Sequence, residues 1–126
     1  MGRHNVGRRP HKSLRRSFQD AISGFWIAFC QERNIHIQLS AGFLVLALSF
    51  ILHISRQNFI VILLLIGGVI SLELVNTSVE RVVDLVTQER HPMAKAAKDT
   101  AAAAVWWFSV IAVIIFIVIL IDTLSH

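Results

Sequence analysis

Three long stretches of the chain are strongly apolar, and polar or charged residues mark their ends. Residues 34–55 and residues 100–121 contain no Asp, Glu, Lys or Arg, and residues 59–81 are apolar over most of their length. A helix of about 20 apolar residues crosses the hydrocarbon core of a bilayer, which is about 30 Å thick. The pattern therefore predicts membrane-spanning helices at about 34–55, 59–81 and 99–121.

A fourth helix is predicted before these spans, over residues 13–32. Its apolar residues recur at helical spacing between charged and amide side chains, which is the pattern of an amphipathic helix lying on a membrane surface. They are Leu14, Phe18, Ile22, Phe25, Trp26 and Phe29. Residues 1–12 form a basic tail, expected to be mobile and to touch anionic headgroups. Residues 1–126 thus form one all-α membrane domain.

Composition and charge agree with a membrane protein. Of the 126 residues, 55% are hydrophobic and 16% are charged, and the net charge is +4. The basic residues lie beside apolar spans, so lipid and topology explain them better than nucleic acid. Of the twelve Lys and Arg, only Arg56 lies between the first two spans. This bias places the N-terminus and the second connection in the cytoplasm and the C-terminus outside.

A stripe of polar side chains interrupts the second span and continues beyond it. Glu73, Asn76, Glu80 and Asp84 are spaced three, four and four residues apart, which puts them on one helix face. Counted from Phe59, Glu73 lies roughly 20 Å along the helix, within the membrane. An ionisable residue at such depth is a functional candidate. The alternative is a carboxyl group that only joins helices.

The positions of these groups favour phosphoryl transfer. Glu32 and Glu80 lie on the cytoplasmic side and have the carboxylate oxygens that Mg²⁺ prefers. Lys98 could neutralise a polyphosphate, and Glu73 could act as general base on a lipid hydroxyl. Together they describe transfer of phosphate from a nucleotide to a lipid alcohol.

Other interpretations of the same residues remain open. The carboxylates could form structural ion pairs with Arg81, Arg90 or Lys98. A small transporter could also bury a membrane glutamate, and a membrane-anchored interaction protein would need no reactive group. The chain has no P-loop, no zinc-type cysteine pattern and no G-x-S-x-G motif. Three short spans hardly enclose a site alone, which favours a homo-oligomer.

The polar stripe and the following connection resemble the small prokaryotic integral-membrane diacylglycerol kinase family. The matching motifs are E-L-V-N-T-S-V-E-R-V-V-D-L at residues 73–85, H-P-M-A-K-A-A-K-D at 91–99 and, more weakly, E-R-N at 32–34. The resemblance covers residue 13 to the end. L-L-I-G-G at residues 64–68 and the second motif bring the chain nearer to the Gram-positive undecaprenol kinase branch.

The resemblance implies a homotrimer in the bacterial cytoplasmic membrane, with active sites shared between neighbouring protomers. It implies that Glu73 is the proton acceptor, that Asn76 supports it, and that Glu32 and Glu80 bind Mg²⁺. It further implies that ATP, the phosphoryl donor, is contacted by Glu89, Arg90, His91, Lys98 and Asp99. The expected acceptor is undecaprenol, with diacylglycerol as the alternative.

One position departs from the family pattern. The family often has an arginine three residues before the lysine of its surface helix, where it contacts nucleotide phosphates. If Arg16 matches that lysine, the position is Ser13 in this chain. Lys12 or Arg15 is the candidate substitute.

Overall fold

A computed structural model describes residues 11–126, and this part of the chain contains four α-helices and no strand. The helices are α1 (Leu14–Gln31), α2 (Arg33–Ile51), α3 (Arg56–Val86) and α4 (Pro92–Ser125). The predicted all-α fold is therefore confirmed. The predicted basic tail lies, up to residue 10, outside the described residues.

Local sequence features explain where the helices begin. The Ser13 hydroxyl caps α1 by accepting a hydrogen bond from the Arg16 N–H at 3.3 Å, and Ser55 caps α3 in the same way. His91 caps α4, with Nδ1 accepting from the Met93 N–H at 3.1 Å, and Pro92 occupies the first helical turn. Glu32 is extended, with φ −111°, and this single residue separates α1 from α2.

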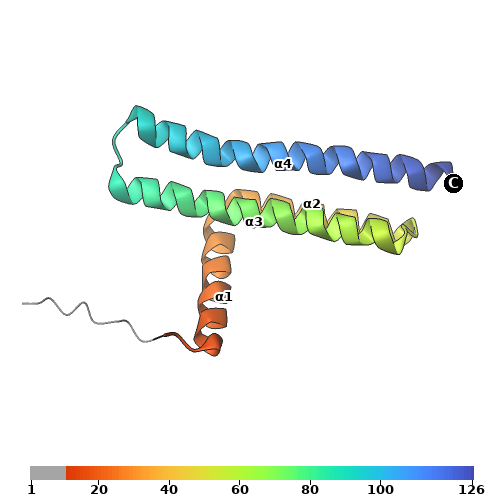
Figure 1. Cartoon of the computed structure of the whole chain (residues 1–126), viewed down its shortest axis with the longest axis horizontal. Helices are drawn as coiled ribbons and strands as arrows, with labels where there is room; N and C mark the ends of the chain where they lie inside the picture. The colour runs from red at the N-terminus through yellow and green to blue at the C-terminus, as the bar shows by residue number, and fades with distance from the viewer. Residues whose placement is uncertain (1–10) are drawn as a thin grey trace, which may run out of the picture.

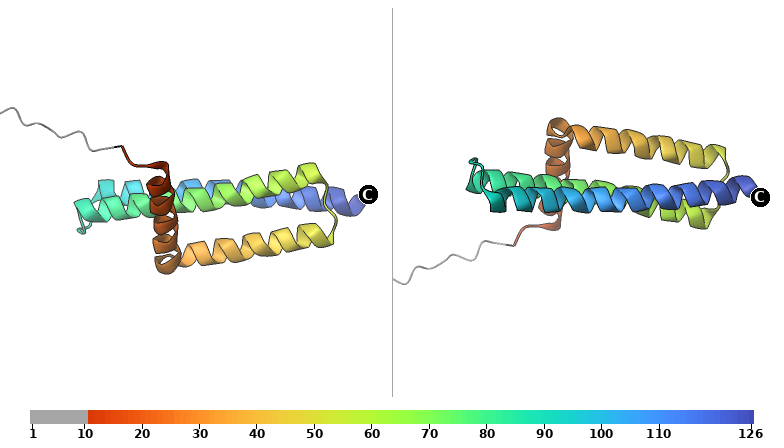
Figure 2. Two further views of the ribbon diagram at one scale, coloured as in Figure 1. Left: turned by 90° about the horizontal axis from the view of Figure 1, so that it is seen from below. Right: turned by 90° about the horizontal axis from the view of Figure 1, so that it is seen from above.

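The three long helices run side by side, and α1 extends away from them on the side opposite α4, transverse to their direction (Figure 1). Helix α3 packs against both α2 and α4, as the two further views also show (Figure 2). The α3–α4 packing is close at Gly68, where a Cβ atom would lie 2.4 Å from Cζ of Phe108. A glycine is required there because any side chain would displace the phenyl ring.

Helices α2, α3 and α4 are each long and apolar enough to cross a membrane. The chain is thus a multi-pass membrane protein, as the hydrophobic pattern predicted. The helices differ in length, however, because α2 has 19 residues whereas α3 has 31 and α4 has 34. The last turns of α3 and the first turns of α4 consequently extend past the level where α1 meets α2 (Figure 1). The placement of α1 on the membrane surface stays a prediction.

Candidate functional site

Glu73 is buried between α3 and α2, with only 2% of its surface exposed. Its Oε1 accepts a hydrogen bond from Asn34 Nδ2 at 3.3 Å, and its Oε2 accepts one from Gln38 Nε2 at 3.1 Å. Each carboxylate oxygen therefore has an amide donor from α2. Among residues 11–126 no Lys, Arg or His side chain forms an ion pair with Glu73, so these two amides orient the carboxylate.

The level of Glu73 along the bundle follows from these two partners. Asn34 and Gln38 belong to the first two turns of α2, next to the corner where α1 ends. Glu73 is thus far along α3 from its start, as the sequence predicted, but level with the beginning of α2. The carboxyl group therefore lies near the end of α2 that is joined to α1.

The remaining stripe residues follow Glu73 toward the end of α3. Asn76 is 6% exposed, and its Nδ2 donates to Glu80 Oε1 at 3.5 Å. Within residues 11–126, Asn76 Oδ1 has no hydrogen-bond partner. Glu80 itself is half-buried. Asn76 therefore offers an unpaired oxygen beside a carboxylate.

Glu32 and Glu80 are each adjacent in the sequence to one of two residues that are hydrogen bonded to each other. Arg81 Nη2 donates to Gln31 Oε1 at 2.7 Å, which joins α3 to the end of α1. Glu32 follows Gln31, and Glu80 precedes Arg81. Over residues 11–126, no group of three or more His, Cys, Asp or Glu side chains is arranged to hold a metal ion. The two-carboxylate metal site therefore stays a prediction.

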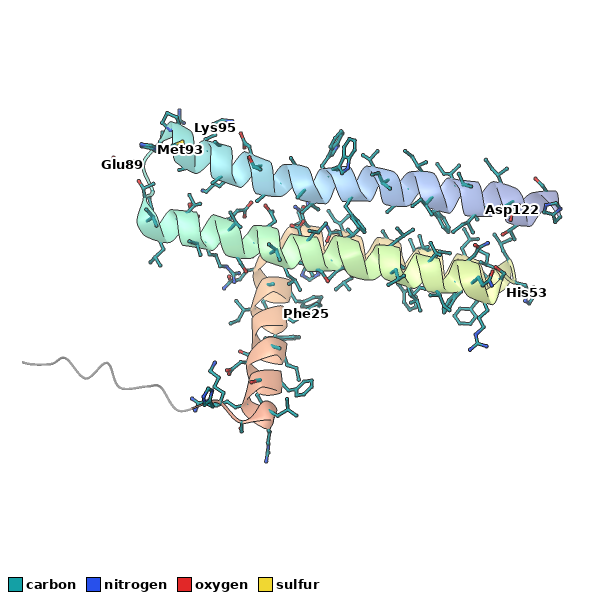
Figure 3. All side chains as sticks on the ribbon, viewed as in Figure 1. Phe25, His53, Glu89, Met93, Lys95 and Asp122 are labelled. Atoms are coloured by element: carbon teal, nitrogen blue, oxygen red, sulfur yellow. The ribbon has the colours of Figure 1, made fainter. Side chains whose placement is uncertain are left out.

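A charged pocket of about 630 Å³ lies between the end of α3 and the start of α4. Figure 3 shows Glu89, Met93 and Lys95 at this end of the molecule, opposite His53 and Asp122. The structure brings all five predicted nucleotide-binding residues to the lining of this pocket: Glu89, Arg90, His91, Lys98 and Asp99.

Four charged residues that line this pocket form two ion pairs with one another. Lys98 Nζ pairs with Asp84 Oδ1, and Lys95 Nζ pairs with Asp99 Oδ2. The sequence-based alternative of structural ion pairs thus holds for Asp84 with Lys98. Arg81, by contrast, bonds to an amide. The nucleotide-binding roles of these residues stay predictions.

An apolar groove of about 260 Å³ runs between α2, α3 and α4. Its lining is almost entirely aliphatic, and Gln38 is its one amide side chain. Since Gln38 also donates to Glu73, the polar end of the groove adjoins the buried carboxyl group. The arrangement suits an apolar chain that carries a hydroxyl at its end.

Sequence reasoning missed three residues of this site. Asn34 entered the sequence analysis only within the weak E-R-N motif and Gln38 was given no role, although their spacing of four places both on one helix face. Thr77 was not singled out, yet only 2% of its surface is exposed and its hydroxyl has no partner among the described residues.

Three apolar helices, a buried carboxyl group near one end and a charged pocket beyond it define a small multi-pass membrane protein with a polar site at one end of its spans. Comparison with known protein families identifies the class more narrowly. The family model for prokaryotic diacylglycerol kinase matches residues 19–120. The chain belongs to this family, and it is therefore a lipid kinase.

Individual relatives agree with this assignment. The chain is 46% identical to an undecaprenol kinase of Bacillus subtilis over 87 residues, which are 69% of this chain and 71% of that protein. It is 41% identical to a diacylglycerol kinase of Synechocystis over 87 residues, covering 68% of this chain but half of that protein. A diacylglycerol kinase of Pseudomonas aeruginosa is 30% identical over 79 residues, or 63% of this chain and 64% of that protein. The predicted resemblance to the Gram-positive branch is confirmed.

Proposed function

We propose that this protein transfers the γ-phosphate of ATP to the hydroxyl of undecaprenol at the cytoplasmic face of the bacterial membrane. The observation that carries the proposal is Glu73, buried and held by two amides where an apolar groove meets the polar end of the bundle. A base in this position meets a hydroxyl that arrives from the membrane. Diacylglycerol is the alternative acceptor.

The chemistry assigns Glu73 the role of general base. Its carboxylate takes the proton of the lipid hydroxyl while the hydroxyl oxygen forms a bond to the γ-phosphorus. The bond between that phosphorus and the oxygen bridging to the β-phosphate breaks, and ADP leaves. Asn34 and Gln38 orient the carboxylate, and Asn76, one helix turn further along α3, supports the site.

The charged pocket is the proposed nucleotide site. Lys98 contributes the cation that meets the phosphates, and Asp99, Glu89, Arg90 and His91 complete the lining. Lys98 pairs with Asp84, so nucleotide binding would exchange this carboxylate for a phosphate as the partner of the Lys98 ammonium group. Lys12 or Arg15 supplies the further cation near Ser13.

The residues of the α1–α3 corner fit a hard divalent cation. Glu80 receives only a long bond from an amide, and Asn76 Oδ1 beside it is unpaired among the described residues. Mg²⁺ takes one or two protein carboxylates together with water and phosphate oxygens. Glu32 and Glu80 would hold it. When bound, the ion neutralises negative charge on the phosphates.

The preference for undecaprenol is supported by the B. subtilis relative, whose name states that activity. That relative shares more of its sequence with the chain than the diacylglycerol kinases do. The aliphatic groove agrees with either lipid, because both present a hydroxyl at the end of apolar chains.

A homotrimer with sites between protomers is the proposed assembly. Within the described residues the chain buries few large side chains, whereas Phe43, Leu64 and Trp106 are all more than 60% exposed. Lipid covers part of this surface, and neighbouring copies cover the rest. The excess of Lys and Arg at the pocket end supports its placement in the cytoplasm.

The test measures ADP release by purified protein in lipid with Mg²⁺ and ATP, with undecaprenol or diacylglycerol added. We expect turnover on undecaprenol that Glu73→Gln abolishes while assembly is retained. Asp122→Asn is the matched control, because Asp122 is an exposed carboxylate at the opposite end of α4. Preference for diacylglycerol would overturn the acceptor, and full activity of Glu73→Gln would overturn the base.

A further inference from the structure

The hydroxyl of Thr77 behaves differently from other hydroxyl groups in these helices. Ser49, Ser78 and Thr100 each donate a hydrogen bond to the carbonyl oxygen four residues earlier. Ser49 and Thr77 are equally buried, at 2% exposure. Thr77 Oγ1 nevertheless has no partner within residues 11–126, although the Glu73 carbonyl lies four residues before it. Its hydroxyl is thus left free for another partner.

The position of Thr77 on α3 connects two functional groups. At 3.6 residues per turn, Glu73, Thr77 and Glu80 lie within about 60° of one another on the helix face. Thr77 is one turn beyond Glu73 and one turn before Glu80. Because Glu80 is half-buried whereas Glu73 and Thr77 are buried, solvent approaches this face from the Glu80 side.

The proposed reaction requires a route for a proton. Each turnover leaves the proton of the lipid hydroxyl on the Glu73 carboxyl group, and the next turnover requires that group to be ionised again. Asn34 and Gln38 reach it only with amide donors, which cannot accept the proton. A group that both accepts and donates is needed on the other side.

We infer that the Thr77 hydroxyl relays the proton from Glu73 to water at the cytoplasmic end of α3. The hydroxyl oxygen accepts the proton released by Glu73 through one bridging water and gives its own proton to water on the Glu80 side. Glu73 returns to its carboxylate form, one proton enters the solvent, and Thr77 ends unchanged. Its role is separate from substrate binding, and the inference rests on the proposed role of Glu73.

Rapid-mixing kinetics separate a relay from a structural role. The reconstituted full-length protein is mixed with Mg²⁺, ATP and undecaprenol, and phosphorylated lipid is followed through the first and later turnovers. In Thr77→Val, which keeps the shape but lacks the hydroxyl, we expect a first turnover at the wild-type rate. Later turnovers should slow about tenfold or more, with an increased solvent deuterium isotope effect. Thr77→Ser should retain wild-type kinetics.

Each alternative outcome identifies what is wrong. Wild-type later turnovers in Thr77→Val would overturn the relay, and equal slowing of first and later turnovers would show that Thr77 only positions the site. Activity in Glu73→Gln would instead reject the base on which the relay depends. If Thr77→Val fails to assemble, Thr77→Ala provides the second variant without a hydroxyl, and the same three results apply.

Discussion

Arg81 and Gln31 are 50 residues apart in the sequence, yet Arg81 Nη2 donates to Gln31 Oε1 at 2.7 Å. This bond joins the C-terminal half of α3 to the end of α1, directly beside Glu80 and Glu32 in the sequence. Of the two proposed metal ligands, Glu80 belongs to α3 and Glu32 lies between α1 and α2, and among the described residues their side chains form no hydrogen bond that joins these segments. The relative position of the two carboxylates therefore depends on their neighbours.

We predict that Arg81→Met raises the Mg²⁺ concentration needed for half-maximal activity about fivefold, corresponding to about 1 kcal/mol for a hydrogen bond of this kind. Gln31→Ala should have a similar effect, and the double variant should be no worse than either single one. Electron paramagnetic resonance of Mn²⁺, measured with a non-hydrolysable ATP analogue, checks the affinity without turnover. Additive effects of the two substitutions would show that this bond does not position the ligands.

Gln38→Leu should destabilise the protein by about 1–3 kcal/mol, because it leaves Oε2 of the buried Glu73 without its donor. Activity should fall with it, since the carboxylate loses its orientation. Thermal unfolding in detergent and ADP release are the measurements. Gln57→Leu, at an exposed glutamine at the other end of α3, is the control. If the glutamine acts through the carboxylate charge, Gln38→Leu should cost less stability in a Glu73→Gln background than in the wild type.

Gly68→Ala should lower stability by about 1–3 kcal/mol, because the new Cβ would overlap the Phe108 ring. The adjacent Gly67→Ala is the matched control, since a Cβ there meets no atom within 4 Å in the described chain. Adding Phe108→Leu should restore part of the loss. Equal effects of the two alanine substitutions would contradict close α3–α4 packing as the reason for Gly68.

Lys98→Met should raise the KM for ATP about tenfold or more while leaving the KM for the lipid nearly unchanged, because the cation faces the charged pocket. Steady-state kinetics with each substrate varied separately provide the measurement. Arg56→Gln, at the start of α3 far from this pocket, controls for loss of positive charge. A larger change in the KM for the lipid than in the KM for ATP would show that Lys98 contributes to binding of the lipid acceptor.

The hydrogen bond and charge of Lys12 hold the pKa of Asp20 below its ordinary value of 3.8. Because the pKa of Asp20 is lower in the folded protein, the ion pair stabilises the start of α1 at pH values above 3.8. This contribution is lost as pH falls through the lower, folded value. Titration of the Asp20 carboxyl carbon by NMR should give a midpoint below 3.8, and Lys12→Met should raise it. An unchanged midpoint in Lys12→Met would show that Lys12 does not lower the pKa of Asp20.

Much of the fold was predictable because the membrane imposes a simple pattern. The uncharged stretches predicted the spans, whereas the caps at Ser13 and His91 became evident only in the structure. The face carrying Glu73 also followed from spacing alone. The partners of Glu73 did not, because pairing Asn34 and Gln38 with it requires the register between α2 and α3, which apolar side chains do not specify by inspection. Thr77 was missed because an isolated threonine in a helix carries no signal until its hydrogen bonding is known.

Because the spanning helices differ in length, we expect the activity to depend on the thickness of the bilayer. Helix α2, at 19 residues, spans about 28 Å and matches a hydrocarbon core of about 30 Å, whereas α3 and α4 are far longer. We infer that the length of α2 sets the depth of Glu73 below the headgroups, because Glu73 is hydrogen bonded to the first turns of α2. A water-soluble donor and a membrane-bound acceptor can then meet at one plane, and only the phosphoryl group has to cross it.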